Sequence, residues 1–73
     1  MFDLRLNRAE HSRRYSIVSA HPSGWLVKFE EDLKLRRHDW YDDWHRVERA
    51  LTLFRLEVRS LKEAGWVVAP EEN

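Results

Sequence analysis

The sequence contains no cysteine. This absence excludes disulfide bonds and thiolate zinc sites, and it fits a reducing compartment. Only two glycines are present, both at expected turns, so the chain has no glycine-rich phosphate loop. A nucleophilic cysteine and a Gly-x-Ser-x-Gly elbow are lacking as well. We therefore expect a protein that is not an enzyme and uses no cofactor.

Net charge is also lacking, because thirteen lysines and arginines balance thirteen aspartates and glutamates. No overall field draws the chain to nucleic acid or to an anionic membrane, so a charged binding face has to arise by local segregation. No apolar run approaches membrane-spanning length, and the first eight residues alternate apolar with charged, unlike a signal peptide. We expect a soluble, cytoplasmic protein with no membrane partner.

The chain is short, at 73 residues, but 42% of them are hydrophobic, which is enough for one core. We expect a single α+β domain over 1–69 and a frayed tail over 70–73. A domain of this size has little room to enclose a small-molecule substrate.

Alternation of apolar and polar side chains predicts four short antiparallel strands, over 2–6, over 14–18, from residue 25 and from residue 33. The turn signal His21-Pro22-Ser23-Gly24 separates the second strand from the third, because proline presets φ and glycine accepts a positive φ.

Cross-strand parity constrains the pairing around that turn. An odd-numbered loop pairs Ile17 with Val27 and Tyr15 with Phe29, which places these side chains on one face. The alternate set that includes Val18 competes for the same face.

The next hairpin allows two registers. A two-residue turn at 31–32 sets Leu35 opposite a lysine, whereas a three-residue loop at 30–32 sets Phe29 opposite Leu33 and Val27 opposite Leu35. We expect the three-residue loop, with both leucines on the inner face.

A long helix follows, because Asp42 and Asp43 supply an N-cap and favourable charge at the positive end of the helix dipole. Gly65 is a natural C-cap. The apolar stripe of this helix comprises Val47, Leu51, Phe54, Val58 and Leu61. The expected fold is a small antiparallel sheet of about four strands in ββββα order, with the C-terminal helix packed on one face.

Residues 66–69, Trp-Val-Val-Ala, allow two interpretations. They either add a short strand or cover the edge of the core.

The outer face of this sheet is predicted to be basic although the chain is neutral. Its cationic and aromatic candidates for nucleic-acid binding are Arg5, Arg14, Lys28, Lys34, Arg36, His38 and Trp40. Such a combination suits single-stranded nucleic acid, and the ββββα order is shared with small modules that bind it, an analogy of topology alone. Lysine and arginine on a solvated face also serve solubility and edge protection.

Two leucines point away from the helix stripe, Leu53 and Leu56. Scattered surface leucines are ordinary, but this pair is a candidate protein interface for an adaptor, an inhibitor or a homodimer.

His38, Asp42 and His45 are the side chains that best suit a divalent metal. Their spacing matches no metal motif, and helix capping explains the aspartate more simply, so we predict no metal site. The sequence thus favours a small binding module for single-stranded nucleic acid or, alternatively, for protein, which would bind through the outer helix face or a sheet edge.

Overall fold

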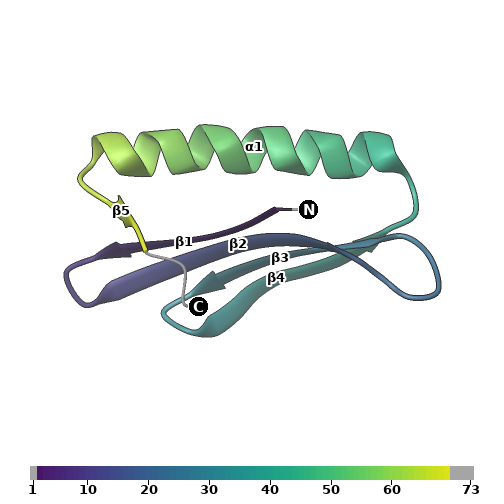
Figure 1. The fold of residues 1–73 in the computed structure, drawn as a ribbon, viewed down its shortest axis with the longest axis horizontal. Coiled ribbons are helices and arrows are strands. Elements are labelled where there is room, and N and C mark those ends of the chain that lie inside the picture. Colours follow the sequence, from purple (N-terminus) through teal and green to yellow (C-terminus); the bar gives the residue numbers. More distant parts are fainter. Residues whose placement is uncertain (1, 70–73) are drawn as a thin grey trace.

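The computed structural model describes residues 2–69 as one sheet covered by one helix (Figure 1). The elements in chain order are β1 (Phe2–Arg8), β2 (His11–Ser19), β3 (Trp25–Glu31), β4 (Lys34–Tyr41), α1 (Trp44–Glu63) and β5 (Val67–Val68). All neighbouring strands are antiparallel, in the order β4-β3-β2-β1-β5. The predicted α+β fold with ββββα order is confirmed, and β5 is an addition at the edge.

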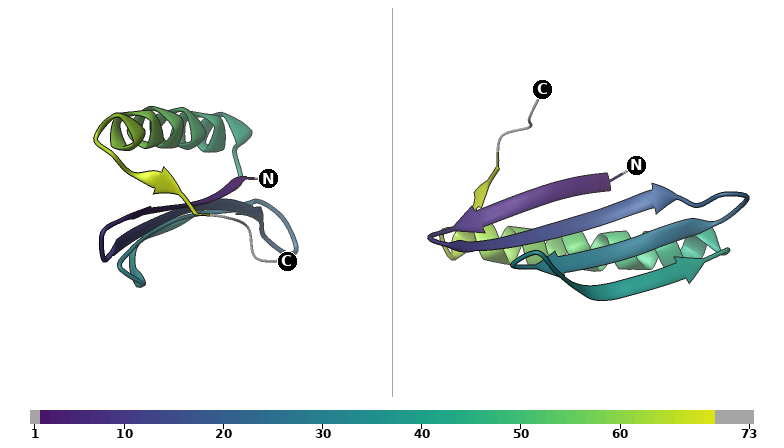
Figure 2. Two further views of the ribbon diagram at one scale, coloured as in Figure 1. Left: turned by 60° about the vertical axis from the view of Figure 1, so that its left-hand side comes forward. Right: turned by 90° about the horizontal axis from the view of Figure 1, so that it is seen from below.

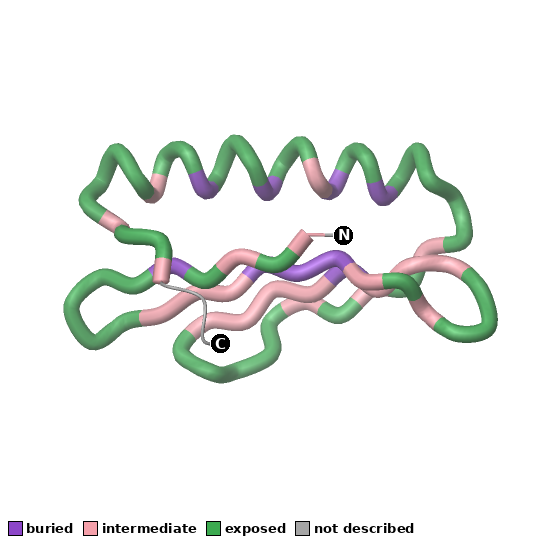
Figure 3. The backbone as a smooth tube through the Cα atoms, in the orientation of Figure 1, coloured by how far each residue is buried: buried purple, intermediate pink, exposed green. Residues whose placement is uncertain are grey.

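The sheet has an inner face toward α1 and an outer face that no other described element covers (Figure 2). The core lies between the inner face and the underside of α1, where the buried segments are concentrated (Figure 3). Its buried hydrophobic members are Leu6, Tyr15, Ile17, Val27, Val47, Ala50, Phe54 and Val58. Tyr15 lies at the centre, because its ring centroid is 4.9 Å from that of Phe29 and also 4.9 Å from that of Phe54.

The ends of α1 follow local chemistry. A side-chain oxygen of Asp43 accepts a hydrogen bond from the backbone N–H of His45 at 2.9 Å, which confirms the predicted N-cap. At the other end Gly65 adopts φ +99° directly after the cap residue Ala64, a conformation that favours glycine.

The pairing of β2 with β3 has the predicted parity. Ile17 lies opposite Val27 and Tyr15 opposite Phe29, across a loop that ends at Gly24. The outer face receives the alternate set, including Val18, which pairs with Leu26.

The pairing of β3 with β4 differs from the prediction. The turn contains two residues, Asp32 and Leu33, both with positive φ, and a β-bulge near Phe29 leaves Arg36 without a partner in β3. Leu33 is 84% exposed in the turn, and Leu35 lies opposite Glu30 on the outer face. The expectation that both leucines reach the core is therefore wrong.

The physical reason lies in the turn. A leucine with φ 68° is unfavourable by itself. However, a carboxylate oxygen of Asp32 accepts a hydrogen bond from the Ser12 N–H at 2.9 Å, and the Asp32 N–H donates to the Ser12 carbonyl at 2.8 Å. These bonds tie the two-residue turn to β2.

The chain after α1 adopts the first of its two predicted interpretations. Val67 and Val68 pair with Asn7 and Leu6 of β1, while Trp66 packs against the core. The predicted tail over 70–73 lies outside the described residues. Within 2–69, no helix combines the length and apolar character needed to cross a membrane.

Candidate functional site

Five of the predicted nucleic-acid contacts lie on the outer face of the sheet. They are Arg5, Arg14, Lys28, His38 and Trp40, as the strand register requires. Lys28 lies opposite His38, and Arg5 lies opposite Arg14. The predicted outward direction is therefore right for this part of the set.

Arg14 is not a free cation. Its guanidinium donates to both carboxylate oxygens of Asp3, at 2.9 and 2.7 Å. Because of this hydrogen bond, the pKa of Asp3 lies below its usual value, so the carboxylate is charged at neutral pH. Glu30 lies opposite Arg14 on β3 and adds a second acidic group to the same face. The outer face is thus of mixed charge.

Two cations of the predicted set lie elsewhere. Lys34 lies opposite Glu31 in the strand register. The Nε of Arg36 is 3.7 Å from a carboxylate oxygen of the same glutamate. Glu31 belongs to the inner face, since it lies 3.3 Å from Arg13, which also reaches Glu57 of α1 at 3.6 Å. The two-residue turn places Lys34 on the inner face, and the bulge restores the predicted parity only from Arg37 onward, so the predicted outward placement of Lys34 and Arg36 is wrong.

Trp40 is half-exposed, but its indole edge is engaged. The indole N–H donates to the carbonyl of Ser23 at 3.1 Å, and the ring lies against Gly24. Trp44 lies at the junction of sheet and helix, with its ring centroid 5.2 Å from that of Trp25.

The residues weighed as metal ligands do not form a centre. His38 lies on the outer face, whereas Asp42 and His45 flank the start of α1. No three histidine or acidic side chains in the described part of the chain are placed to hold a metal ion.

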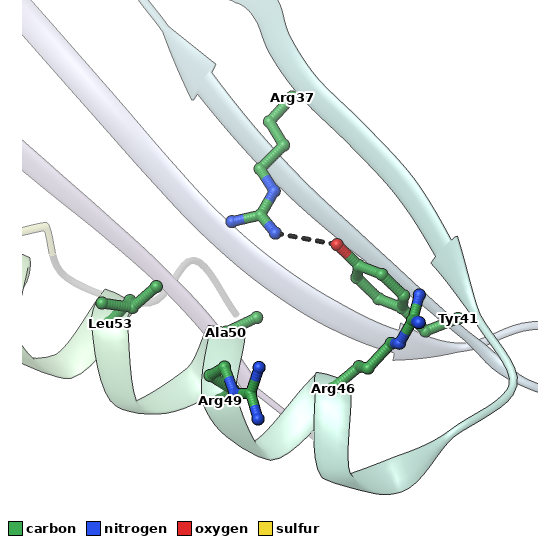
Figure 4. A pocket seen from close by; sticks show the side chains of 6 residues that line it. All are labelled: Arg37, Tyr41, Arg46, Arg49, Ala50 and Leu53. Atoms are coloured by element: carbon green, nitrogen blue, oxygen red, sulfur yellow. Dashed lines mark hydrogen bonds between the residues drawn. The ribbon is translucent and has the colours of Figure 1, made fainter.

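A groove runs between β4, which is one edge of the sheet, and the adjacent flank of α1 (Figure 4). Its volume is about 300 Å³. We call it the arginine groove, and it is lined by Arg37, Tyr41, Arg46, Arg49, Ala50 and Leu53. Because no described strand lies beyond β4, the groove opens along an unpaired strand edge.

Arg37 forms the ordered wall of this groove. Its Nε donates to a carboxylate oxygen of Asp39 at 2.6 Å, and a terminal nitrogen donates to the Tyr41 hydroxyl at 3.1 Å. The guanidinium carbon is 5.8 Å from the ring centroid of Phe54, within cation–π range. Burial acts to lower the pKa of Arg37, but the hydrogen bonds with Asp39 and Tyr41 outweigh it and raise this pKa overall. Arg37 is therefore a fixed cation.

Arg46 and Arg49 form the opposite wall, three residues apart on one side of α1. Both are exposed, and neither forms an ion pair with any residue of 2–69. Side chains at this spacing are neighbours on a helix surface, and like charges there repel each other. An anion placed between them would remove that repulsion, so the groove suits a negatively charged group.

The two predicted interface leucines have different surroundings. Leu53 lines the arginine groove and is 56% exposed, whereas Leu56 is 58% exposed and lies outside the lining. Of the two leucines, Leu53 alone lines the arginine groove together with its cationic side chains.

Sequence reasoning did not assign Arg37, Tyr41, Arg46 or Arg49 to a site. A signal was present, because Arg37 and Tyr41 share inner-face parity at the end of the last strand. Arg46 and Arg49 lie on the helix side that carries Leu53, and the short connection from β4 to α1 brings the two groups together.

A second groove, of about 310 Å³, lies on the other flank of α1. Its apolar floor and cationic rim are formed by Phe2, Leu4, Arg55, Val58, Arg59 and Lys62. Comparison of the chain with protein-family models, with curated proteins and with solved structures gives no match.

Proposed function

We propose that this chain is a small, non-enzymatic protein-interaction module that binds an extended polypeptide segment by adding it as a strand beside β4. The supporting observation is that the arginine groove lies directly above the edge of β4, beyond which the described part of the chain places no strand. Main-chain hydrogen bonds to an edge strand supply affinity in this type of recognition, and pockets for alternate side chains supply specificity.

The geometry of the edge supports this mode. In an antiparallel strand, alternate residues direct their N–H and C=O groups to the same side, so β4 offers a row of donors and acceptors away from β3. An added strand would direct every second side chain toward the flank of α1. Leu53 and the arginines line that flank.

A second copy of the chain fits this edge poorly. β4 contains three cationic residues, Lys34, Arg36 and Arg37, and only one acidic residue, Asp39. Full antiparallel overlap of two copies of β4 would set Arg36 opposite Asp39, but it would also bring two edges of net positive charge side by side, and like charges at short distance destabilise a sheet. The homodimer considered from the sequence is therefore disfavoured at this surface.

The proposal is tested by selecting binders from a displayed library of random decapeptides and measuring amide exchange in the complex by NMR. We expect slowed exchange at alternate amides of β4. N-methylation of a selected peptide at alternate residues should abolish binding in one phase of the alternation and preserve it in the other. Equal effects of both phases would contradict strand addition.

Leu53 and Leu56 provide a matched pair of variants for the same experiment. Leu53→Asp places a charge in the groove lining and should weaken peptide binding about tenfold, because it removes an apolar contact. Leu56→Asp makes the same chemical change at nearly equal exposure outside the lining and should leave binding unchanged. Equal losses in the two variants would count against the proposed surface.

Single-stranded nucleic acid on the outer face is the second candidate function. The proximity of Lys28 to His38, together with the half-exposed Trp40 further along β4, favours it. The acidic Asp3 and Glu30 oppose it. A titration of labelled oligo(dT) and oligo(U) at low and rising salt tests the hypothesis, since phosphate contacts weaken steeply with salt. Absence of binding at low salt would exclude this function.

A further inference from the structure

We infer that the arginine groove selects an acidic side chain, followed two residues later by an apolar one, in the segment that adds beside β4. This inference rests on the proposed function and deepens it by naming the class of peptide. The supporting observation is that Arg46 and Arg49, which form no ion pair within residues 2–69, lie next to Leu53 in a single lining.

The first element of the motif follows from charge. Arg37, Arg46 and Arg49 bring three positive charges to the groove, and Asp39 neutralises only that of Arg37. The remaining cations project from adjacent turns of α1 and are both exposed. A carboxylate on a short aliphatic stem can accept hydrogen bonds from both while its stem lies against Tyr41 and Ala50.

The second element follows from distance. Arg49 and Leu53 are four residues apart in α1, which corresponds to about 6 Å along the helix axis. Two residues of an extended strand span about 6.6 Å, and residues two apart point to the same face. An added strand that places a carboxylate beside Arg49 therefore places the side chain two residues away beside Leu53.

The order of the two elements follows from direction. α1 runs back over the sheet after β4, so Arg49 lies toward the Tyr41 end of the groove and Leu53 lies further along (Figures 1 and 4). A segment that pairs with β4 in the antiparallel sense passes the Tyr41 end first. Antiparallel pairing is the more stable ladder and is the one used throughout this sheet. The expected order is thus acidic-x-apolar from the N-terminus.

The experiment measures binding of four synthetic decapeptides by fluorescence anisotropy. One carries Glu-x-Leu, one Lys-x-Leu, one Glu-x-Ser and one the reversed order Leu-x-Glu, in the same alternating background of threonine and valine. We expect the first to bind best, with losses of about tenfold for lysine in place of glutamate, because a charge-assisted hydrogen bond is replaced by repulsion. Smaller losses are expected for the other two peptides.

A charge-reversal variant makes the assignment specific to the groove. Arg49→Glu should weaken the Glu-x-Leu peptide about tenfold and strengthen the Lys-x-Leu peptide, whereas simple damage to the fold would weaken both. Arg46→Glu is the second variant with the same expectation. Arg55→Glu is the matched control, because Arg55 is also exposed on α1 but belongs to the second groove. It should leave the preference unchanged.

The outcomes separate this inference from the proposed function. If all four peptides bind equally while amides of β4 become protected, strand addition stands and the acidic motif is refuted. If no selected or synthetic peptide protects β4, both are refuted. If oligo(dT) displaces the peptide and loses affinity in Arg49→Glu, the groove binds nucleic acid and the peptide motif is overturned.

Discussion

Arg13 provides the most informative test of what holds the helix to the sheet. Its guanidinium carbon lies 5.9 Å from the ring centroid of Phe29 and 5.3 Å from that of Trp66. Its terminal nitrogens lie 3.3 Å from a carboxylate oxygen of Glu31 and 3.6 Å from one of Glu57. One side chain thus links β3, α1 and the segment that follows α1.

The substitution Arg13→Met retains the aliphatic stem and removes the charge. Each partly exposed ion pair contributes about 0.5 kcal/mol, and each cation–π contact about 0.5–1 kcal/mol. We therefore expect the free energy of unfolding to fall by about 2 kcal/mol. A domain of this length has a total stability of about 4–11 kcal/mol, so the midpoint of thermal unfolding should fall by about 10 °C.

Urea denaturation followed by tryptophan fluorescence measures this change. High salt should reduce the difference between the native chain and Arg13→Met to about 1 kcal/mol, because salt screens the ion pairs more than the ring contacts. Arg59→Met is the control, since its pair with Glu63 at 3.8 Å is highly exposed and should contribute less than about 0.5 kcal/mol. Equal losses in Arg13→Met and Arg59→Met would refute the assignment.

Three further predictions concern the turns and the outer face. Gly24→Ala should destabilise the fold by about 2 kcal/mol or more in the same assay, because Gly24 has φ +89° and an added Cβ would lie 2.7 Å from the ring of Trp40. Leu33→Gly should stabilise the fold by about 0.5–1 kcal/mol, because Leu33 is exposed and loses no core contact, and because glycine adopts φ 68° without steric strain. The lowered pKa of Asp3 means that its pairing with Arg14 stabilises the fold above the unfolded-state pKa and is lost as pH falls through the lower folded-state pKa. Asp3→Asn should therefore be less stable than the native chain at neutral pH, and acid denaturation curves of the two should converge below about pH 4.

The elements whose chemistry is local could be predicted from the sequence. The Asp43 cap, the apolar stripe of α1 and the turn at Gly24 each leave a signature within a few residues. The pairing of Ile17 with Val27 followed from parity alone. These features fixed the order of the strands and the face that α1 covers.

The end of β4 could not be predicted in the same way. The bulge at Arg36 has no distinctive residue, and the two-residue turn depends on hydrogen bonds between Asp32 and Ser12, which lie 20 positions apart. A single misassigned turn shifted the faces of Lys34 and Arg36. The arginine groove was missed because it joins a strand edge to a helix flank, and neither amphipathic pattern describes such a junction.

Arg36, which has no strand partner in β3, divides β4 into two parts that pair with β3 in different registers. Leu35 pairs with Glu30 and Arg37 pairs with Phe29, so these two residues would be consecutive partners of β3 if Arg36 were deleted. Removal of this one residue would give an uninterrupted ladder without moving either flank out of register. The strand can therefore change length by one residue at this point while the lining above it keeps its composition, which makes position 36 a natural place for an engineer to adjust the curvature of the edge.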